Sequence, residues 1–242
     1  VVSRMGIGLD NIDVDYCTSQ NIPVTNVPDY CLQEVAEHTL ASVYSLGRHI
    51  NTYNLNSKAG KYDREVTPPL RRLKGQTLGI IGLGNIGQRV AELANTLGFR
   101  VLGFRQDMTK TVPGVELVLF EDLISQSDFI TLHLPLTDIN HHMIGAEQFQ
   151  NMKSTAYLVN TARGGLIDHT ALATALKTGE LAGAALDVQD PEPPDLNTAP
   201  YNDPRVIVTP HAAFVSVESL IELRRKSVKN ALDILTTLWR SR

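Results

Sequence analysis

The chain has 242 residues, of which 43% are hydrophobic and 20% are charged, and its formal net charge is −4. This composition is ordinary for a globular protein, and the length is enough for one large domain or two small ones. The slight acidity gives no reason to expect nucleic acid or a membrane surface as a partner. No apolar run in the sequence approaches the roughly 20 residues that a membrane span needs.

The cysteine content bears on the cellular compartment, and the first residues bear on whether the sequence is complete. Cys17 and Cys31 are its only cysteines. Two are too few for a disulfide framework, so we expect reduced thiols in a cytoplasmic protein. The sequence opens with Val-Val-Ser-Arg, already inside an expected strand, and we expect that an N-terminal segment is missing from it.

Short apolar segments and amphipathic segments alternate along the chain, which predicts an α/β fold with a parallel, doubly wound sheet of the Rossmann type. The polar stretch that contains Pro68-Pro69 is expected to form a linker over residues 51–74. Asp10, Asn11 and Asp13 are candidate N-caps for a short helix that ends at about Gln20. Periodicity and capping predict further helices at about 32–50, 85–97, 123–126, 146–152, 169–178 and 216–239. Strands are expected at 1–4, 22–25, 77–81, 100–104, 129–132, 156–160, 182–186 and 206–208.

A glycine-rich turn follows the first long apolar strand and opens a helix. Gly82, Gly84 and Gly87 match G-x-G-x-x-G. The first makes a tight turn, the second lets the backbone approach a pyrophosphate, and the third lets the helix pack closely on the strand. The first helical residues, Asn85 and Ile86, present N–H groups to the phosphates. Because a second strand follows within about 20 residues, the pattern indicates a dinucleotide site rather than a turn without a ligand.

The other unusual polar residues fall where expected strands end. In an open parallel sheet, ligands bind beyond the carboxyl ends of the strands. This arrangement is harder to explain by packing than any single residue would be. The residues are Arg105, His133, Thr161–Arg163, Asp187 and His211.

Three side chains form a candidate set for anchoring a substrate and moving a proton. The guanidinium of Arg163 offers bidentate bonds to a carboxylate and can polarise an adjacent carbonyl. His211 follows a proline at a strand end, and histidine is the usual proton donor near neutral pH. Glu192, in a proline-stiffened stretch, would stabilise an imidazolium and orient the ring. Taken singly, each of the three can equally be a plain loop residue.

Two further positions bear on the cofactor and on metals. Arg105 ends the second strand of the glycine-rich unit, where an acid normally binds the ribose hydroxyls, and an arginine there accommodates a 2′-phosphate. This favours NADP over NAD, although Asp107 lies close enough along the chain to reach the ribose. His141-His142 has no further ligand at suitable spacing, so we expect surface histidines and no metal.

Longer motifs surround these residues, and in combination they are specific. Together they resemble the D-isomer-specific 2-hydroxyacid dehydrogenases over essentially the whole chain. The motifs are G-L-G-N-I-G at 82–87, L-V-N-T-A-R-G-G-L-I-D at 158–168, G-A-A-L-D-V at 183–188, P-E-P at 191–193 and T-P-H-A-A at 209–213. The resemblance is closest to the C-terminal-binding-protein-like branch, on R-M-G-I-G-L-D-N-I-D at 4–13, N-H-H-M-I at 140–144 and T-P-H-A-A-F at 209–214.

The resemblance implies roles for the three candidate residues. Arg163 would anchor the substrate carboxylate and orient its keto group, His211 would be the general acid/base, and Glu192 would be its partner. Hydride would pass between a nicotinamide and the 2-keto carbon. The implied function is a D-specific, NAD(P)-dependent oxidoreductase that acts on small 2-keto or 2-hydroxy acids.

The resemblance also implies cofactor and substrate contacts. Asp187 would hold the nicotinamide carboxamide, Thr161 and Ala162 would line the nicotinamide site, and Leu134 and Pro135 would form the wall on the adenosine side. In the branch named above, tryptophan usually stands at position 214, so Phe214 keeps an aromatic wall without the indole N–H. The implied substrate contacts are Arg4, Gly6, Ile7, Gly8 and Phe214.

The domain organisation implied by the resemblance is a dinucleotide-binding domain at 28–221. Residues 1–27 and 222–242 would be remnants of a flavodoxin-like substrate domain whose N-terminal part is missing. A homodimer through the helix at 32–50 is also implied, although its apolar positions can equally be internal core.

Two alternative functions share this pattern. A dinucleotide-sensing, corepressor-like scaffold would bind the cofactor with weak turnover or none. A degenerate scaffold has no need of Arg163, Glu192 and His211, and their presence together favours catalysis. Formate dehydrogenase shares the fold but pairs its histidine with glutamine, and Glu192 counts against it.

Overall fold

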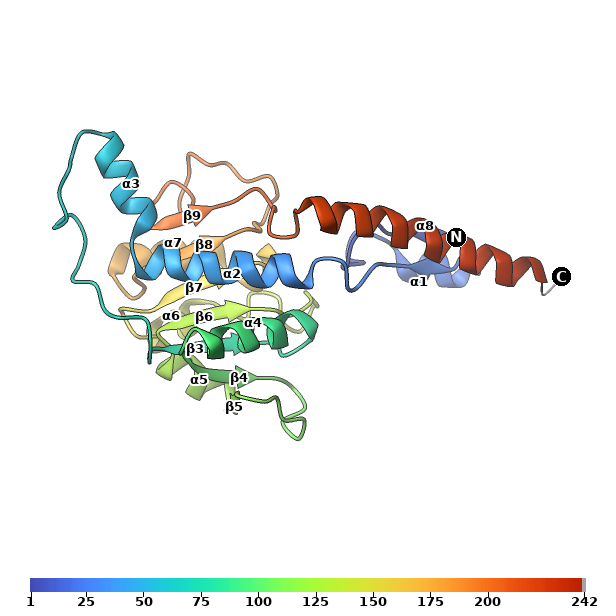
Figure 1. Cartoon of the computed structure of the whole chain (residues 1–242), viewed down its shortest axis with the longest axis horizontal. Coiled ribbons are helices and arrows are strands. Elements are labelled where there is room, and N and C mark those ends of the chain that lie inside the picture. The colour runs from blue at the N-terminus through green and yellow to red at the C-terminus, as the bar shows by residue number, and fades with distance from the viewer. Residues whose placement is uncertain (241–242) are drawn as a thin grey trace. The chain divides into compact units, whose positions relative to one another are not determined.

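The structure is a computed structural model that describes residues 1–240. The chain divides into two compact units, drawn in Figure 1: the terminal unit, made of residues 1–34 and the chain from Phe214 onward, and the sheet unit, Val35–Ala213. The sheet unit is shorter at both ends than the expected domain at 28–221. The reason is that residues just before 35 contact residues just after 213, within the terminal unit. The Tyr30 and Phe214 rings meet edge to face at 6.2 Å, and Ser216 Oγ donates to Glu34 Oε1 at 2.7 Å.

Seven parallel strands form one sheet in the sheet unit, in the order β5-β4-β3-β6-β7-β8-β9 (Figure 1). From β3 the chain runs outward to β4 and β5, and then returns to β6 on the other side of β3. A crevice for a ligand is expected at this reversal of strand order, between β3 and β6. The strands are β3 (Thr77–Ile81), β4 (Arg100–Phe104), β5 (Glu116–Leu117), β6 (Phe129–Leu132), β7 (Tyr157–Asn160), β8 (Gly183–Leu186) and β9 (Val206–Val208).

Helices cover both faces of the sheet, as a doubly wound fold requires. Successive residues of a strand point to opposite faces, and Ile80 and Ile81 accordingly belong to different core clusters. The helices α2 (Leu32–Gly47) and α4 (Asn85–Thr96) supply the cluster that contains Ile80. The other cluster receives α5 (Phe120–Gln126), α6 (Ala146–Asn151) and α7 (His169–Thr178).

The expected helix over 32–50 and the linker after it are partly wrong. The helix α2 ends at Gly47, and a second helix, α3 (Ile50–Lys58), occupies the first part of the expected linker. Between them His49 lies in the left-handed region at φ 51°, a conformation that commonly ends a helix. The short strand β5 and the 3₁₀ turn η1 (Gly164–Leu166) were not predicted either.

The apolar positions of α2 belong to the core of the sheet unit. Ala36, Leu40, Val43 and Leu46 are buried in the same cluster as the apolar residues of α4. These side chains are therefore internal core in the single chain. They do not by themselves point to a dimer interface.

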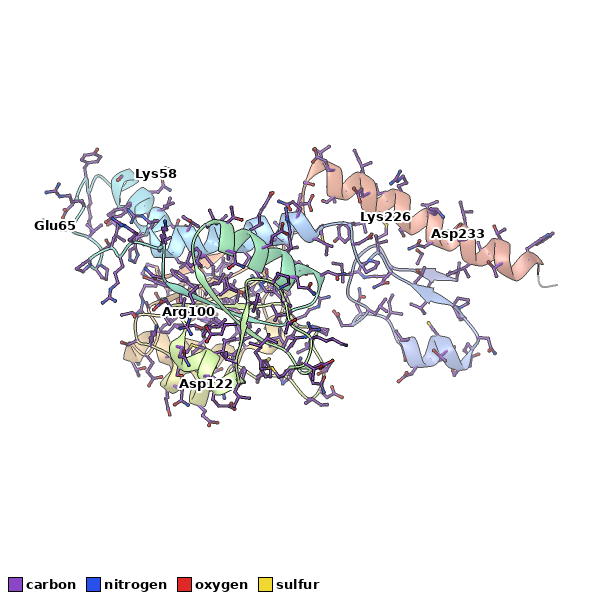
Figure 2. The ribbon with its side chains drawn as sticks, turned by 60° about the horizontal axis from the view of Figure 1, so that its bottom comes forward. Lys58, Glu65, Arg100, Asp122, Lys226 and Asp233 are labelled. Carbon is purple, nitrogen blue, oxygen red and sulfur yellow. The ribbon has the colours of Figure 1, made fainter. Side chains whose placement is uncertain are left out.

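The terminal unit is built on two short parallel strands, β1 (Val2–Ser3) and β2 (Val24–Thr25). Asp13 caps the helix α1 (Val14–Ser19), where its carboxylate accepts from the Tyr16 amide. The long helix α8 (Val217–Arg240) carries Lys226 (Figure 2). The ammonium of Lys226 lies 3.1 Å from Asp29 and 2.9 Å from Glu222. Among residues 1–240, no helix combines the length and apolar content that crossing a membrane requires.

Candidate active site

The glycine-rich turn after β3 contains three glycines in different steric situations. Gly82 lies at φ +98°, and a Cβ there would come within 2.5 Å of the His133 carbonyl oxygen. A Cβ on Gly87 would come within 1.9 Å of the Gly82 oxygen, whereas a Cβ on Gly84 would meet nothing within 4 Å. The chain's own packing therefore requires Gly82 and Gly87. The space over Gly84 is open to a ligand.

The helix that begins at Asn85 presents its first amides beside this open space. Gly84 is the N-cap of α4 and has no side chain to accept from those amides. Uncapped N–H groups at a helix N-terminus bind phosphate well. Asn85 and Ile86 thus lie where the sequence analysis expected the pyrophosphate to bind.

The end of β6 lies on the other side of the strand reversal from β4. The His133 amide donates to the Ile81 carbonyl at 2.8 Å, and a Cβ on Gly82 would lie 2.8 Å from Leu134 Cδ2. Pro135 follows, and its carbonyl accepts from Asn140 Nδ2 at 2.8 Å. Leu134 and Pro135 thus directly follow the strand that borders the turn, which fits the wall expected of them.

His133 itself is half-buried, and its Nε2 atom is enclosed. Its Nε2 atom has no hydrogen-bond partner within the described part of the chain. Burial lowers the pKa of His133 from 6.5 to about 3, because the charged ring would lose its hydration. The ring is therefore neutral near pH 7, at a strand end beside the cofactor motif.

The loop after β4 carries Arg105 and Asp107, the two residues on which the expected choice between NADP and NAD depends. Arg105 Nη1 donates to the Lys110 carbonyl at 3.3 Å. The Asp107 carboxylate accepts from Thr109 Oγ1 at 2.5 Å and pairs with Lys110 Nζ at 3.1 Å. The hydrogen bonds from Thr109 and Lys110 lower the pKa of Asp107. Asp107 is thus held inside its own loop, and two cations lie near it.

The turn after β7 holds Arg163 through a residue that the sequence analysis missed. Asn160 is fully buried, its Nδ2 donates to the Arg163 carbonyl at 2.8 Å, and its Oδ1 accepts from the Ala162 amide at 3.0 Å. Thr161 Oγ1 lies 3.0 Å from Thr39 Oγ1 on α2. The Arg163 guanidinium donates to the Ala162 carbonyl at 2.7 Å. A buried amide at the end of an apolar strand was the available sequence signal.

Asp187, at the end of β8, anchors the loop that carries His211. It is 2% exposed, and its carboxylate accepts from Thr209 Oγ1 at 2.5 Å and from the Ala212 and Ala213 amides at 2.9 Å each. Its carbonyl accepts from the His211 amide at 2.8 Å. The family resemblance implies a cofactor contact for Asp187, but it did not predict these hydrogen bonds to the loop.

One further polar side chain reaches the same anchor from α2. His38 Nε2 lies 3.2 Å from Thr209 Oγ1 and 3.7 Å from the Asp187 carboxylate. The sequence analysis missed His38, because nothing in the helical pattern indicates that this position faces the strand ends.

His211 and Glu192 meet, as expected from the resemblance. His211 Nδ1 lies 2.7 Å from Glu192 Oε1, and the two side chains are 42% and 39% exposed. His211 also lies in the left-handed region at φ 52°. Backbone conformations of this kind in residues other than glycine cluster at active sites and ligand clamps. Because an ionised carboxylate only accepts, Nδ1 carries the proton of this hydrogen bond and Nε2 is the second ring nitrogen.

The expected substrate contacts lie in the terminal unit. Arg4 Nη1 donates to the Met5 carbonyl at 2.9 Å, and a Cβ on Gly6 would lie 3.3 Å from the Arg4 guanidinium carbon. The Ile7 carbonyl accepts from Asn26 Nδ2 at 2.7 Å, and Gly8 follows in the same loop. Phe214 packs against Tyr30 as described above. The roles of Arg4, Gly6, Ile7, Gly8 and Phe214 stay predictions.

Comparison with known proteins identifies the family. Residues 40–213 match the sequence profile described as D-isomer specific 2-hydroxyacid dehydrogenase, NAD binding domain. The chain therefore belongs to the D-isomer specific 2-hydroxyacid dehydrogenase family, whose matched domain binds NAD.

Individual relatives support this assignment. The chain is similar to the D-3-phosphoglycerate dehydrogenase of Methanocaldococcus jannaschii, with 45% identity over 90% of this chain and 42% of the relative. It is 39% identical to the glyoxylate reductase of Korarchaeum cryptofilum, over 96% of this chain and 72% of the relative. The crystal structure of an Aquifex aeolicus D-lactate dehydrogenase complexed with NAD and lactic acid superimposes with a TM-score of 0.87, at 32% identity over 96% of this chain and 75% of that one.

The comparisons confirm the expected family and the Rossmann-type, NAD-binding fold. The chain spans less than half of the phosphoglycerate dehydrogenase and about three quarters of the lactate dehydrogenase. The C-terminal-binding-protein-like branch stays a prediction, because these matches support the family as a whole.

Proposed function

We propose that the protein transfers a hydride between a nicotinamide dinucleotide and a small D-2-hydroxy or 2-keto acid. The observation that carries this proposal is the His211–Glu192 pair. An imidazole held 2.7 Å from a carboxylate, at a strained backbone position and partly open to solvent, is the arrangement that a proton donor needs. His211 follows β9, at the same edge of the sheet as the glycine-rich turn.

A bound reduced nicotinamide would supply the hydride for the keto carbon in the reductive direction. Arg163 binds the substrate carboxylate through its guanidinium and orients the neighbouring carbonyl. The protonated ring of His211 gives the proton on Nε2 to the carbonyl oxygen, which completes the hydroxyl group. Glu192 holds Nδ1–H and stabilises the charged ring before the transfer. In the oxidative direction, His211 takes the hydroxyl proton back.

The proposal includes NADP(H) as the preferred form of the cofactor. Arg105 and Lys110 place two cations on the loop after β4, where the adenosine ribose of the cofactor is expected, and the carboxylate of Asp107 is engaged by Thr109 and Lys110. An arginine at this position suits a 2′-phosphate. Arg105→Gln should lower the ratio of kcat/KM for NADPH to that for NADH about ten- to hundredfold, the value of hydrogen bonds to a charged group. A wild-type preference for NADH would overturn the NADP part alone.

The remaining expectations belong to this proposal. We assign cofactor binding to residues 28–221 and substrate selection to the two end segments. Cys17 and Cys31 are both free and buried, which suits a reducing compartment such as the cytoplasm. A homodimer is proposed from the family resemblance, and light scattering would measure it. No contact with nucleic acid is proposed.

The test of the function is the initial rate of NADPH and NADH oxidation by the whole protein with glyoxylate, hydroxypyruvate, pyruvate and 4-methylthio-2-oxobutyrate. We expect turnover of at least one acid, and Arg163→Gln should abolish most of it. The matched control is Arg205→Gln, because Arg205 precedes β9 at the opposite edge of the sheet and pairs with Asp203. Tight dinucleotide binding with no turnover of any acid would overturn the proposal and favour the dinucleotide-sensing scaffold.

A further inference from the structure

Three side chains of metal-ligating type converge on the surface of the sheet unit, and none of them is assigned to the reaction. His141 and His142 are adjacent in sequence, and Asp190 comes from the loop after β8. One ligand atom from each residue lies within 4.8 Å of one from each of the others, and all three residues are exposed. The sequence analysis dismissed the histidine pair for want of a further ligand. The fold supplies that ligand from a distant part of the chain.

The backbone turns both histidine rings to the same side. Adjacent residues of an extended chain point in opposite directions, but His142 lies in the left-handed region at φ 54°. The two rings consequently stack, with centroids 3.8 Å apart and planes inclined by 26°. The His142 amide donates to the Gly165 carbonyl at 2.8 Å, which fixes the pair against η1. The pair is thus presented together on a fixed turn.

His141 and Asp190 both lie close to Gly165. A Cβ at this glycine would lie 3.4 Å from Asp190 Oδ2 and 3.4 Å from His141 Cδ2. The carboxylate and one ring therefore approach the same point from two different loops. Leu136 Cδ2 would be nearer still, at 2.9 Å, so the absence of a side chain at Gly165 allows this close approach.

A fourth polar group, His169, lies beside the cluster and does not compete with a cation. Its Nδ1 lies 3.1 Å from the Tyr201 hydroxyl, and its Nε2 lies 3.2 Å from the Gly164 carbonyl. Both ring nitrogens are therefore engaged. Burial lowers the pKa of His169, so the ring is neutral near pH 7 and does not repel a cation at the cluster.

We propose that His141, His142 and Asp190 form a binding site for a divalent transition metal, with Zn²⁺ as the ion that fits best. Two imidazoles and one carboxylate are ligands that Zn²⁺ takes in proteins. Bonds of about 2.0–2.2 Å in a tetrahedral site require ligand atoms about 3.4 Å apart. The ligand atoms, which lie within 4.8 Å of one another, would close to this separation by rotation of the exposed side chains. Water would complete the coordination.

Occupation of this site would tie two loops together. Asp190 lies two positions before Glu192, and the histidine pair lies on the loop that follows Leu134 and Pro135. A bound ion would therefore restrain the segment that carries the partner of His211. The site itself does not depend on the proposed reaction, and it can be tested without turnover.

The experiment is calorimetric titration of Zn²⁺ into tag-free, chelator-stripped protein. We expect one ion per chain. Each of His142→Gln and Asp190→Asn should weaken the affinity at least about tenfold, since even groups that merely support metal ligands are worth about 10–100-fold. The matched control is Asp138→Asn, an exposed acid on the same loop as the histidines and outside the cluster. It should leave the affinity unchanged.

A second readout locates the ion. Hydrogen exchange should slow on Zn²⁺ addition at the amides around His142 and Asp190, and it should not change around Cys17 and Cys31, whose thiols could also bind Zn²⁺. The proposal is overturned if no saturable binding is seen, if Asp190→Asn and Asp138→Asn bind equally well, or if protection appears at the cysteines.

Discussion

The turn after β3 and the loop after β9 lie at the same edge of one sheet, and different physics holds each in place. In the turn, Gly82 and Gly87 are required because any Cβ would run into backbone atoms. In the loop, Asp187 gathers the Ala212 and Ala213 amides onto its carboxylate and thereby positions His211. The turn is shaped by excluded volume, and the loop is shaped by hydrogen bonds to one buried acid.

This difference teaches which kind of site a sequence reveals directly. Steric requirements leave glycines at fixed spacing, so the turn is legible as a motif. A hydrogen-bonded loop leaves only scattered polar residues, because the acid and its donors come from neighbouring strands. Substitutions in the turn should change stability or cofactor binding, whereas a substitution in the loop after β9 should change turnover.

The largest expected effect is on the loop after β9. His211→Gln should lower kcat/KM about 10²–10⁴-fold, the usual contribution of a general acid/base, while the dissociation constant of the dinucleotide changes little. Steady-state rates and fluorescence titration of the reduced cofactor measure the two quantities. The control is His49→Gln, since His49 lies beside Tyr157 at the opposite end of β7. Equal losses in both variants would remove His211 from the reaction.

The second effect concerns folding of the turn. Gly87→Ala places a methyl group 1.9 Å from the Gly82 carbonyl oxygen, so backbone must move. Overpacking of this kind costs typically about 1–3 kcal/mol of unfolding free energy, and we expect the upper end. Denaturant unfolding measures it. A variant as stable as the wild type would show that the turn is less rigid than its contacts indicate.

A third prediction concerns His133, which lies beside the turn. An unfolded-chain histidine takes up a proton near pH 6.5, whereas the buried ring resists it until about pH 3. Below pH 6.5 the unfolded state therefore binds more protons than the folded state. The free energy of unfolding then decreases as the pH is lowered, by up to about 1.4 kcal/mol per pH unit. Between pH 7 and 5, wild type should lose up to about 2 kcal/mol more than His133→Leu. Parallel losses in the two proteins would contradict a buried neutral ring.

The smallest effect should separate Gly84 from Gly87. Gly84→Ala meets no atom of the chain, so stability should change by less than about 1 kcal/mol. The added methyl group would occupy the space expected for the pyrophosphate, and the dinucleotide affinity should fall about tenfold or more, equivalent to about 1.4 kcal/mol. Calorimetric titration gives the affinity. Unchanged binding would mean that the cofactor does not approach this position.

Much of the sheet unit was predictable from the sequence because buried parallel strands are continuous apolar runs. The bounds of β3, β4, β6 and β9 agree with the expected residues. The break between α2 and α3 was not predictable, since it depends on a left-handed conformation at His49 that no apolar periodicity records.

The candidate site was predictable in part, and the limit has a physical cause. The pairing of Glu192 with His211 was expected from the motifs that surround them. The tasks of Asn160 and Asp187 were not, because they depend on which backbone amides the fold brings to a buried side chain. Asp190 joins a histidine pair for the same reason, and spacing along the chain gives no hint of it.

The way Asp187 holds the His211 loop has a consequence for sequence variation. Ala212 and Ala213 take part through their main-chain N–H groups alone. Any residue that fits supplies the same donor, and only proline lacks it. Substitutions at the half-buried position 212 can therefore change the side chains around His211 and still keep the hydrogen bond that positions its loop.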